Sequence, residues 1–192
     1  MPGFSIGATI VYVTHDQIEA MTMATRIAVM HQGSVQQFAD PDTVYRYPAN
    51  LFVARFMGSP PMNTMPARFE AENGGPVVVI GAGRPDEVRL RLRGYDAAAS
   101  FVGREVVLGI RPECIAERSR VFSSDRPIVV NAPVEMVELT GAETIVLLRL
   151  GGEPAMARIT PDIRPTPGAP AAFALDTRRI CLFDPQTERL IA

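Results

Sequence analysis

The sequence predicts an α+β protein in which a short α/β unit, residues 1–57, precedes a β-rich domain, residues 58–192. An apolar run at residues 8–13 leads directly into a helical pattern, as in sheets that are covered by helices. Beyond residue 61, short β-type segments alternate with Gly, Pro, Asn and Asp, as in small barrels and sandwiches.

The first unit is predicted to open with a buried strand over residues 8–13 and with a helix that begins in a capping box. Residues 8–13 are rich in β-branched side chains, which is typical of a strand covered on both faces. Thr14 and Gln17 have the T-x-x-Q spacing, in which the hydroxyl accepts from the Gln17 amide and the Gln17 side chain reaches back.

A hairpin and two short helices are expected to complete this unit. Residues 26–30 and 34–38 would pair through a turn that places Gly33 in a left-handed conformation. Pro41 fits the first turn of one helix, and Asn50 can cap the next.

A linker is predicted at residues 58–61, Gly-Ser-Pro-Pro, because a proline pair has neither free φ angles nor backbone donors. The β-rich domain follows. Its expected strands are residues 77–80, 88–93, 105–110, 128–137, 144–150, 155–159, 171–175 and 180–183.

Composition excludes several classes of function. The net charge of -2 gives no basic footprint for a nucleic acid or an anionic membrane. No lysine occurs among the 192 residues, so they hold neither a GxxxxGK[ST] phosphate loop nor a Schiff-base lysine. No apolar run approaches the roughly 20 residues of a membrane span, so we expect neither export nor membrane insertion. Cys114 and Cys181 are far apart and are predicted to be reduced packing residues.

A series of motifs extends from about residue 8 to residue 184. Residues 9–24 read TIVYVTHDQIEAMTMA, and residues 56–60 read FMGSP. This part resembles the switch-histidine region of ABC ATPases that serve sugar, polyol and glycerol-phosphate importers. Beyond the linker, LGIRPE at 108–113, VELTGAET at 137–144 and CLFD at 181–184 resemble the TOBE, or oligomer-binding-type, β domain of the same maltose-importer-like subunits.

The resemblance implies that residues 1–57 are the C-terminal remnant of an α/β P-loop ATPase domain and that residues 58–192 are a regulatory OB-fold-like domain. In this family the phosphate loop, glutamine loop, signature, Walker B aspartate and catalytic glutamate all precede the switch histidine. The residues before Ala8 resemble none of them. ATP and Mg²⁺ are the family's cofactors, but we expect neither to bind tightly to this chain alone, which is predicted to be inactive as an ATPase.

His15 is the candidate catalytic and cofactor-binding residue. It stands where the predicted strand ends and the helix begins, the edge at which α/β proteins bind ligands. The amides of a helix start favour a neutral imidazole that donates to a phosphate oxygen. By resemblance His15 is the γ-phosphate switch; alternatively, it is an ordinary residue of the first turn. His31 is interpreted as a turn residue.

Charged residues of the β-rich domain suggest an interface. Arg111, Glu113, Glu138 and Glu143 are expected either to form ion pairs at hairpin edges or, by resemblance, to belong to a regulatory interface between subunits. The alternating residues Arg89, Arg91 and Arg93 would line a solvated strand face or an anion site. No metal site is predicted.

The resemblance also implies partners and a location. The implied partners are permease membrane subunits and a second copy of the chain, in a homodimer formed through the β domain. The implied location is cytoplasmic, peripheral at the inner face of the plasma membrane. Two alternatives remain open. One is a stand-alone OB-like module that senses a small molecule without ATPase activity. The other is a single-strand nucleic-acid binder, which the negative charge and the lack of Trp disfavour.

Overall fold

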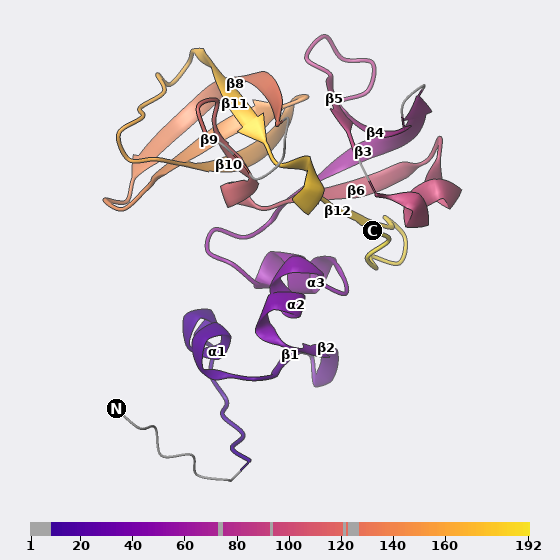
Figure 1. The fold of residues 1–192 in the computed structure, drawn as a ribbon, viewed down its shortest axis with the longest axis vertical. Helices are drawn as coiled ribbons and strands as arrows, with labels where there is room; N and C mark the ends of the chain where they lie inside the picture. The colour runs from indigo at the N-terminus through magenta and orange to yellow at the C-terminus, as the bar shows by residue number, and fades with distance from the viewer. Residues whose placement is uncertain (1–8, 73–74, 93, 121, 123–126) are drawn as a thin grey trace.

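The computed structural model describes residues 9–72, 75–92, 94–120, 122 and 127–192. Three short helices and a two-stranded hairpin form the first part, and two five-stranded antiparallel sheets form the second (Figure 1). A short α/β unit thus precedes a β-rich domain, which confirms the predicted α+β fold class. No helix among the described residues is long and apolar enough to cross a bilayer.

The first part contains α1 (Gln17–Met23), β1 (Ile27–His31), β2 (Ser34–Ala39), α2 (Pro41–Arg46) and α3 (Leu51–Phe56). The second part contains β3 (Asn63–Glu72), β4 (Gly75–Ile80), β5 (Val88–Arg91), β6 (Glu105–Ile110), β7 (Ile115–Glu117), β8 (Ile128–Leu139), β9 (Thr144–Leu150), β10 (Glu153–Ile159), β11 (Pro170–Leu175) and β12 (Cys181–Phe183). Short 3-10 helices lie at η1 (Asp96–Phe101), η2 (Pro112–Cys114) and η3 (Thr177–Arg179).

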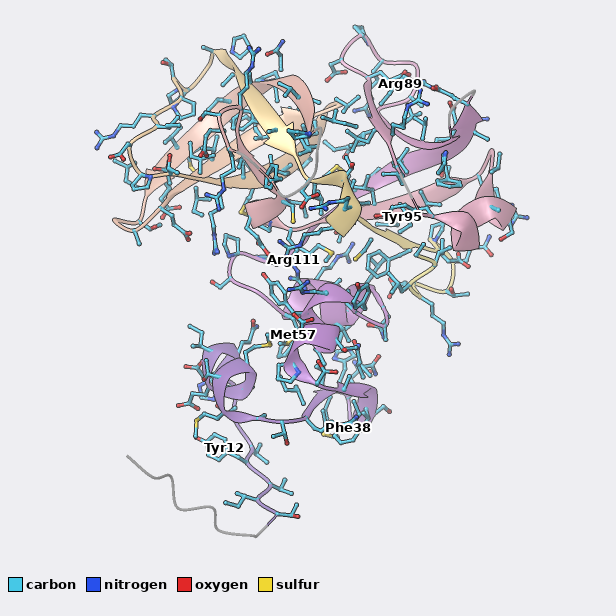
Figure 2. All side chains as sticks on the ribbon, in the orientation of Figure 1. Tyr12, Phe38, Met57, Arg89, Tyr95 and Arg111 are labelled. Carbon is cyan, nitrogen blue, oxygen red and sulfur yellow. The ribbon has the colours of Figure 1, made fainter. Side chains whose placement is uncertain are left out.

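The buried strand predicted over residues 8–13 is wrong for the part that the structure describes. Residues 9–13 form no strand, and Val11 and Val13 are 88% and 90% exposed. Ala8 lies outside the described residues. A strand is stabilised by its neighbours in a sheet, and the one sheet described near this segment consists of β1 and β2, which pair with each other. Figure 2 shows Tyr12 far from both large sheets.

The predicted capping box is also wrong. Asp16 caps α1, because its carboxylate accepts from the amides of Ile18 and Glu19. The Thr14 hydroxyl instead accepts from the Asp16 amide at 2.9 Å and donates to Glu19 Oε2 at 2.9 Å. Asp accepts at an N-cap as well as Thr does, so Thr14 and Asp16, two positions apart, were both candidates for the cap.

The hairpin and the two following helices are confirmed. β1 and β2 pair through a turn with Gln32 at φ 47° and Gly33 at φ 78°, the two left-handed residues that match the twist of a tight hairpin. Asp40 caps α2, which has Pro41 in its first turn. The Asn50 side chain accepts from the Val53 amide at 2.9 Å and caps α3.

The ten strands of the second part form two sheets with the orders β10-β9-β8-β11-β7 and β12-β6-β3-β4-β5. Each of the eight strands predicted beyond the linker overlaps one of them, although Arg93 lies outside the described residues. β3 and β7 were not predicted. β3 contains Pro66, which argues against a strand interior, but β4 pairs with β3 only from Ala67 onward. β7 has only three residues.

The two sheets enclose one core, and the side chain of Asn63 joins one to the other. Large side chains from both sheets are fully buried in it, among them Phe69, Leu108 and Phe173. Asn63 extends β3 sideways to the free edge of β10, where its amide group bonds the Met156 N–H at 2.7 Å and the Met156 carbonyl at 2.8 Å. The sheets therefore form a partly closed barrel rather than two independent layers.

The helices pack against this barrel. Leu51 and Ala54 of α3 share a small core with Met62, Cys181 and Phe183 of the β-rich part. The C-terminal segment contributes backbone bonds, such as the one from the Leu51 amide to the Glu188 carbonyl at 3.0 Å. α3 therefore belongs in packing terms to the barrel as well as to the first unit.

Burial of both cysteines should make the protein less stable at alkaline pH. Both thiols are free and buried, and burial raises the pKa of Cys114 to about 12 and that of Cys181 to about 11, from an ordinary value of 9.0. The folded state therefore keeps protons that the unfolded chain releases above pH 9, so this stabilisation is complete below pH 9 and is lost as pH rises toward 11–12.

Urea denaturation followed between pH 8 and 10.5 should show a falling midpoint above about pH 9. The double variant Cys114→Ala/Cys181→Ala is the control, and its midpoint should depend less on pH across the same range. Equal slopes for the two proteins would contradict the role given to the thiols.

Candidate functional site

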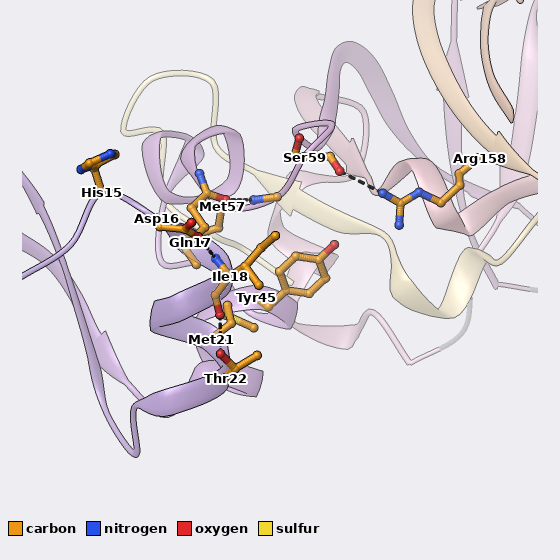
Figure 3. A pocket seen from close by; sticks show the side chains of 11 residues that line it. His15, Asp16, Gln17, Ile18, Met21, Thr22, Tyr45, Met57, Ser59 and Arg158 are labelled. Carbon is orange, nitrogen blue, oxygen red and sulfur yellow. Dashed lines mark hydrogen bonds between the residues drawn. The ribbon is translucent and has the colours of Figure 1, made fainter. Parts of the chain in front are cut away.

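The candidate site is the junction where α1, α2 and the linker meet β10. A cavity of about 530 Å³ lies there. Figure 3 shows the side chains that line it. Its lining combines apolar side chains on the helices with polar groups at the rim. The lining residues are His15, Asp16, Gln17, Ile18, Met21, Thr22, Tyr45, Met57, Gly58, Ser59 and Arg158.

His15 directly precedes Asp16, the N-cap of α1, and its side chain is exposed. The neighbouring backbone is held by the bond from the Asp16 amide to the Thr14 hydroxyl. Within the described ranges no hydrogen bond to the His15 imidazole is found. Figure 3 shows His15 away from Tyr45 and Arg158. The ring is thus accessible to a ligand, while the chain around it is fixed.

Arg111, at the end of β6, is buried and holds the helices against the barrel. It is 3% exposed, and Nη2 donates to the Tyr45 carbonyl at 2.6 Å, while Nη1 donates to the Met57 carbonyl. Its guanidinium carbon lies 3.7 Å from the centre of the Tyr45 ring. Desolvation lowers the pKa of Arg111 from its ordinary value. Figure 2 places Arg111 beside Met57, between helices and sheets.

Glu113 supports the same junction. Its carboxylate accepts from the Tyr45 hydroxyl at 2.9 Å and lies 3.9 Å from Arg179. Burial of the phenol, and next the negative charge of Glu113, raise the pKa of Tyr45 to about 12. For Arg111 and Glu113 the sequence left open ion pairs at hairpin edges or an interface between subunits, and the structure brings both residues together around Tyr45 inside this chain.

The structure separates Glu143 from Glu138. Glu143 Oε2 lies 2.8 Å from Arg158 Nε, in a contact without hydrogen-bond geometry that we interpret as an ion pair. Arg158 also donates to the Ser59 carbonyl at 2.9 Å, which ties β10 to the linker. Glu138 is exposed on β8. Only Glu143 of the two therefore reaches the junction.

The arginines of β5 face glutamates. Arg89 lies 2.6 Å from Glu70, 2.5 Å from Glu72 and 2.8 Å from Glu87. Hydrogen bonds to these carboxylates, the one to Glu87 first, raise the pKa of Arg89 above its ordinary value. Because Arg89 already pairs with three carboxylates, its contacts favour a solvated, ion-paired strand face over an anion-binding site.

The sequence did not predict that Tyr45 and Arg158 belong to the site. It also did not predict that the Gln17 side chain bonds the backbone of Phe56 and Gly58. Tyr45 and Arg158 are single polar residues outside any motif, so no sequence pattern marked them as site residues. In the described part of the chain, no three His, Cys, Asp or Glu side chains are grouped so that they could hold a metal ion.

Comparison with known families accounts for the β-rich part. Residues 58–115 match the MalK OB fold domain, and residues 108–183 match the TOBE domain. The chain corresponds to the C-terminal part of the ATP-binding subunit of a sugar ABC importer. The OB-fold match begins at Gly58, the residue whose backbone lies between Gln17 and Arg111.

Curated relatives agree with this assignment. The trehalose/maltose import ATP-binding protein MalK of Thermococcus litoralis is 42% identical over 97% of this chain and 49% of its own length. The sulfoquinovosyl glycerol transport protein SmoE of Agrobacterium fabrum is 37% identical over 97% and 49%, and the sn-glycerol-3-phosphate import protein UgpC of Burkholderia lata is 39% identical over 95% and 48%. The chain spans about half the length of these relatives.

Substitution of Gly58 should weaken the junction. Gly58 has φ 118°, and a Cβ there would lie 2.8 Å from Arg111 Nη1. We expect Gly58→Ala to lower the free energy of unfolding by about 1–2 kcal/mol for the positive φ, and by about 1–3 kcal/mol more for the overlap. Urea denaturation would measure the loss.

Gly141→Ala is the matched control for this experiment. Gly141 has φ 88°, but a Cβ there would meet no atom within 4 Å. Its substitution should therefore cost only the conformational part. Equal losses for the two variants would show that the close approach to Arg111 does not matter.

Proposed function

We propose that this chain is the part of a sugar importer's ATP-binding subunit that carries the switch histidine and the regulatory domain. The observation that carries the proposal is the position of His15. It lies in the TIVYVTHDQ segment, immediately before the cap of α1, with an exposed imidazole beside the junction with the OB-fold and TOBE regions.

In this proposal His15 donates one hydrogen bond to the γ-phosphate of ATP. A bond of this kind to a charged group is worth about 1.5–3 kcal/mol. Phosphoryl transfer further needs groups that cradle the phosphates and hold Mg²⁺, which neutralises the developing charge. The 192 residues contain no lysine for such a cradle. We therefore propose that this chain alone neither binds ATP tightly nor hydrolyses it.

Partners are proposed on the same basis. The names of the relatives place them in import of trehalose and maltose or of glycerol 3-phosphate, but the solute of this chain's importer is left open. We propose contacts with permease subunits and a homodimer through residues 58–192, with the subunit peripheral at the inner face of the membrane. Of the four predicted interface residues, Glu138 is the exposed one in the part of the chain that the structure describes.

A hybrid subunit would test the switch role. Residues 9–192 of this chain would replace the matching part of the Thermococcus litoralis protein, and ATP hydrolysis would be measured. His15→Ala should lower the rate at least about tenfold, because a lost charge-assisted bond costs more than about 1.4 kcal/mol.

His31→Ala provides the control in the same hybrid. His31 ends β1 and stacks on Phe52, with ring centres 4.1 Å apart, so its loss should leave the hydrolysis rate near that of the parent. Full activity of the His15→Ala hybrid would refute the switch role. Hydrolysis by the unmodified 192-residue chain, abolished by His15→Ala, would refute the claim that it is inactive alone.

A further inference from the structure

One stretch of three residues, 56–58, is held by side chains from two distant parts of the chain. Gln17 of α1 donates through Nε2 to the Phe56 carbonyl and accepts the Gly58 N–H through Oε1 at 2.7 Å. Arg111 of the barrel donates through Nη1 to the carbonyl of Met57, the residue between them. Three consecutive backbone groups are thus bonded alternately by the helix and by the barrel.

The barrel side of this arrangement is rigid. Burying a guanidinium is costly unless its donors are used, and Arg111 donates through Nη1 and Nη2 to the Met57 and Tyr45 carbonyls, while its buried Nε has no partner among the described residues. The Tyr45 ring stacks on the same guanidinium, and its hydroxyl is fixed by Glu113. A shift of residues 56–58 would therefore break bonds that the interior cannot replace.

The helix side is short and close to His15. Gln17 is the first residue of α1 and lies two positions after His15. α1 has no fully buried residue, but Ala20 and Met21 pack against a small core that includes Met57, and the Gln17 bonds add a polar attachment to this packing. Movement at His15 therefore reaches residues 56–58 through the Gln17 bonds as well as through the packing of α1 on Met57.

We propose that Gln17 and Arg111 are positioning residues that couple the His15 segment to the regulatory β domain through residues 56–58. The coupling is a property of the folded chain, whereas its use in sensing the nucleotide rests on the proposed function. In the complete subunit it would let the position of the switch histidine depend on the state of the β domain, and the reverse.

Amide hydrogen exchange of the 192-residue chain, followed by NMR without nucleotide, tests the coupling. Arg111→Lys keeps the charge but removes the forked donor pair. We expect the Gly58 amide to exchange at least tenfold faster, although Arg111 does not bond it. The His15 Hε1 resonance should shift, while the Leu148 amide in the interior of β9 should keep its protection.

Arg149→Lys is the matched control. Arg149 also lies on the barrel and bonds both a carboxylate, Glu135 at 2.7 Å, and a carbonyl, Gly152 at 3.0 Å, but it does not touch residues 56–58. This variant should leave Gly58 exchange and the His15 resonance unchanged. Unchanged Gly58 exchange in a folded Arg111→Lys protein, or the same changes in both variants, would overturn the proposal.

Gln17→Ala tests the coupling from the other end, and it decides the matter if Arg111→Lys does not fold. The Arg111 Nε–H resonance should shift and exchange faster, because Gln17 and Arg111 share only residues 56–58. An unaltered Arg111 resonance would overturn the coupling. The His15→Ala hybrid reports separately on the switch role, so either proposal can fail while the other stands.

Discussion

The buried guanidinium of Arg111 is the constraint on which the arrangement of this molecule depends. Removing a permanently charged group from water is costly, and the cost is offset here by two carbonyl acceptors and by an aromatic face. Both acceptors belong to the helical part of the chain. The helices can therefore occupy only the position in which Tyr45 and Met57 meet Arg111, and Gly58 supplies the space that this position requires.

A second constraint acts within the barrel. The two sheets share one core, and they approach so closely that side chains are excluded at the contact between Gly81 and Gly151. A Cβ at Gly81 would overlap the Gly151 carbonyl. Asn63 satisfies the open edge of β10 with a side-chain amide instead of another strand. Contacts between distant residues thus replace the regular ladder where the sheets meet.

The segment before α1 contrasts with the barrel. Ile10, Val11 and Val13 of this segment are the most exposed large hydrophobic side chains of the described chain. The segment places His15 directly ahead of the cap of α1. The switch residue and the regulatory domain are joined by small hydrophobic clusters around Met57 and Leu51 and, in addition, by a few hydrogen bonds. Such bonds can be made and broken at a modest free-energy cost, which suits a coupling element.

The sequence by itself determined the features that arise from neighbouring residues. The hairpin at Gly33, the Asn50 cap, the place of Pro41 in a first helical turn and the alternation in the barrel strands follow from local chemistry, and the motif around His15 indicated the family. Tertiary structure alone decided which cap candidate α1 uses, that Pro66 lies within a strand, and that Arg111 faces inward. Arg111 depends on Met57, and Gln17, which would have completed the predicted capping box, bonds Phe56 and Gly58 instead. These partners are dozens of residues away, and local sequence carries no record of which distant backbone group will be near.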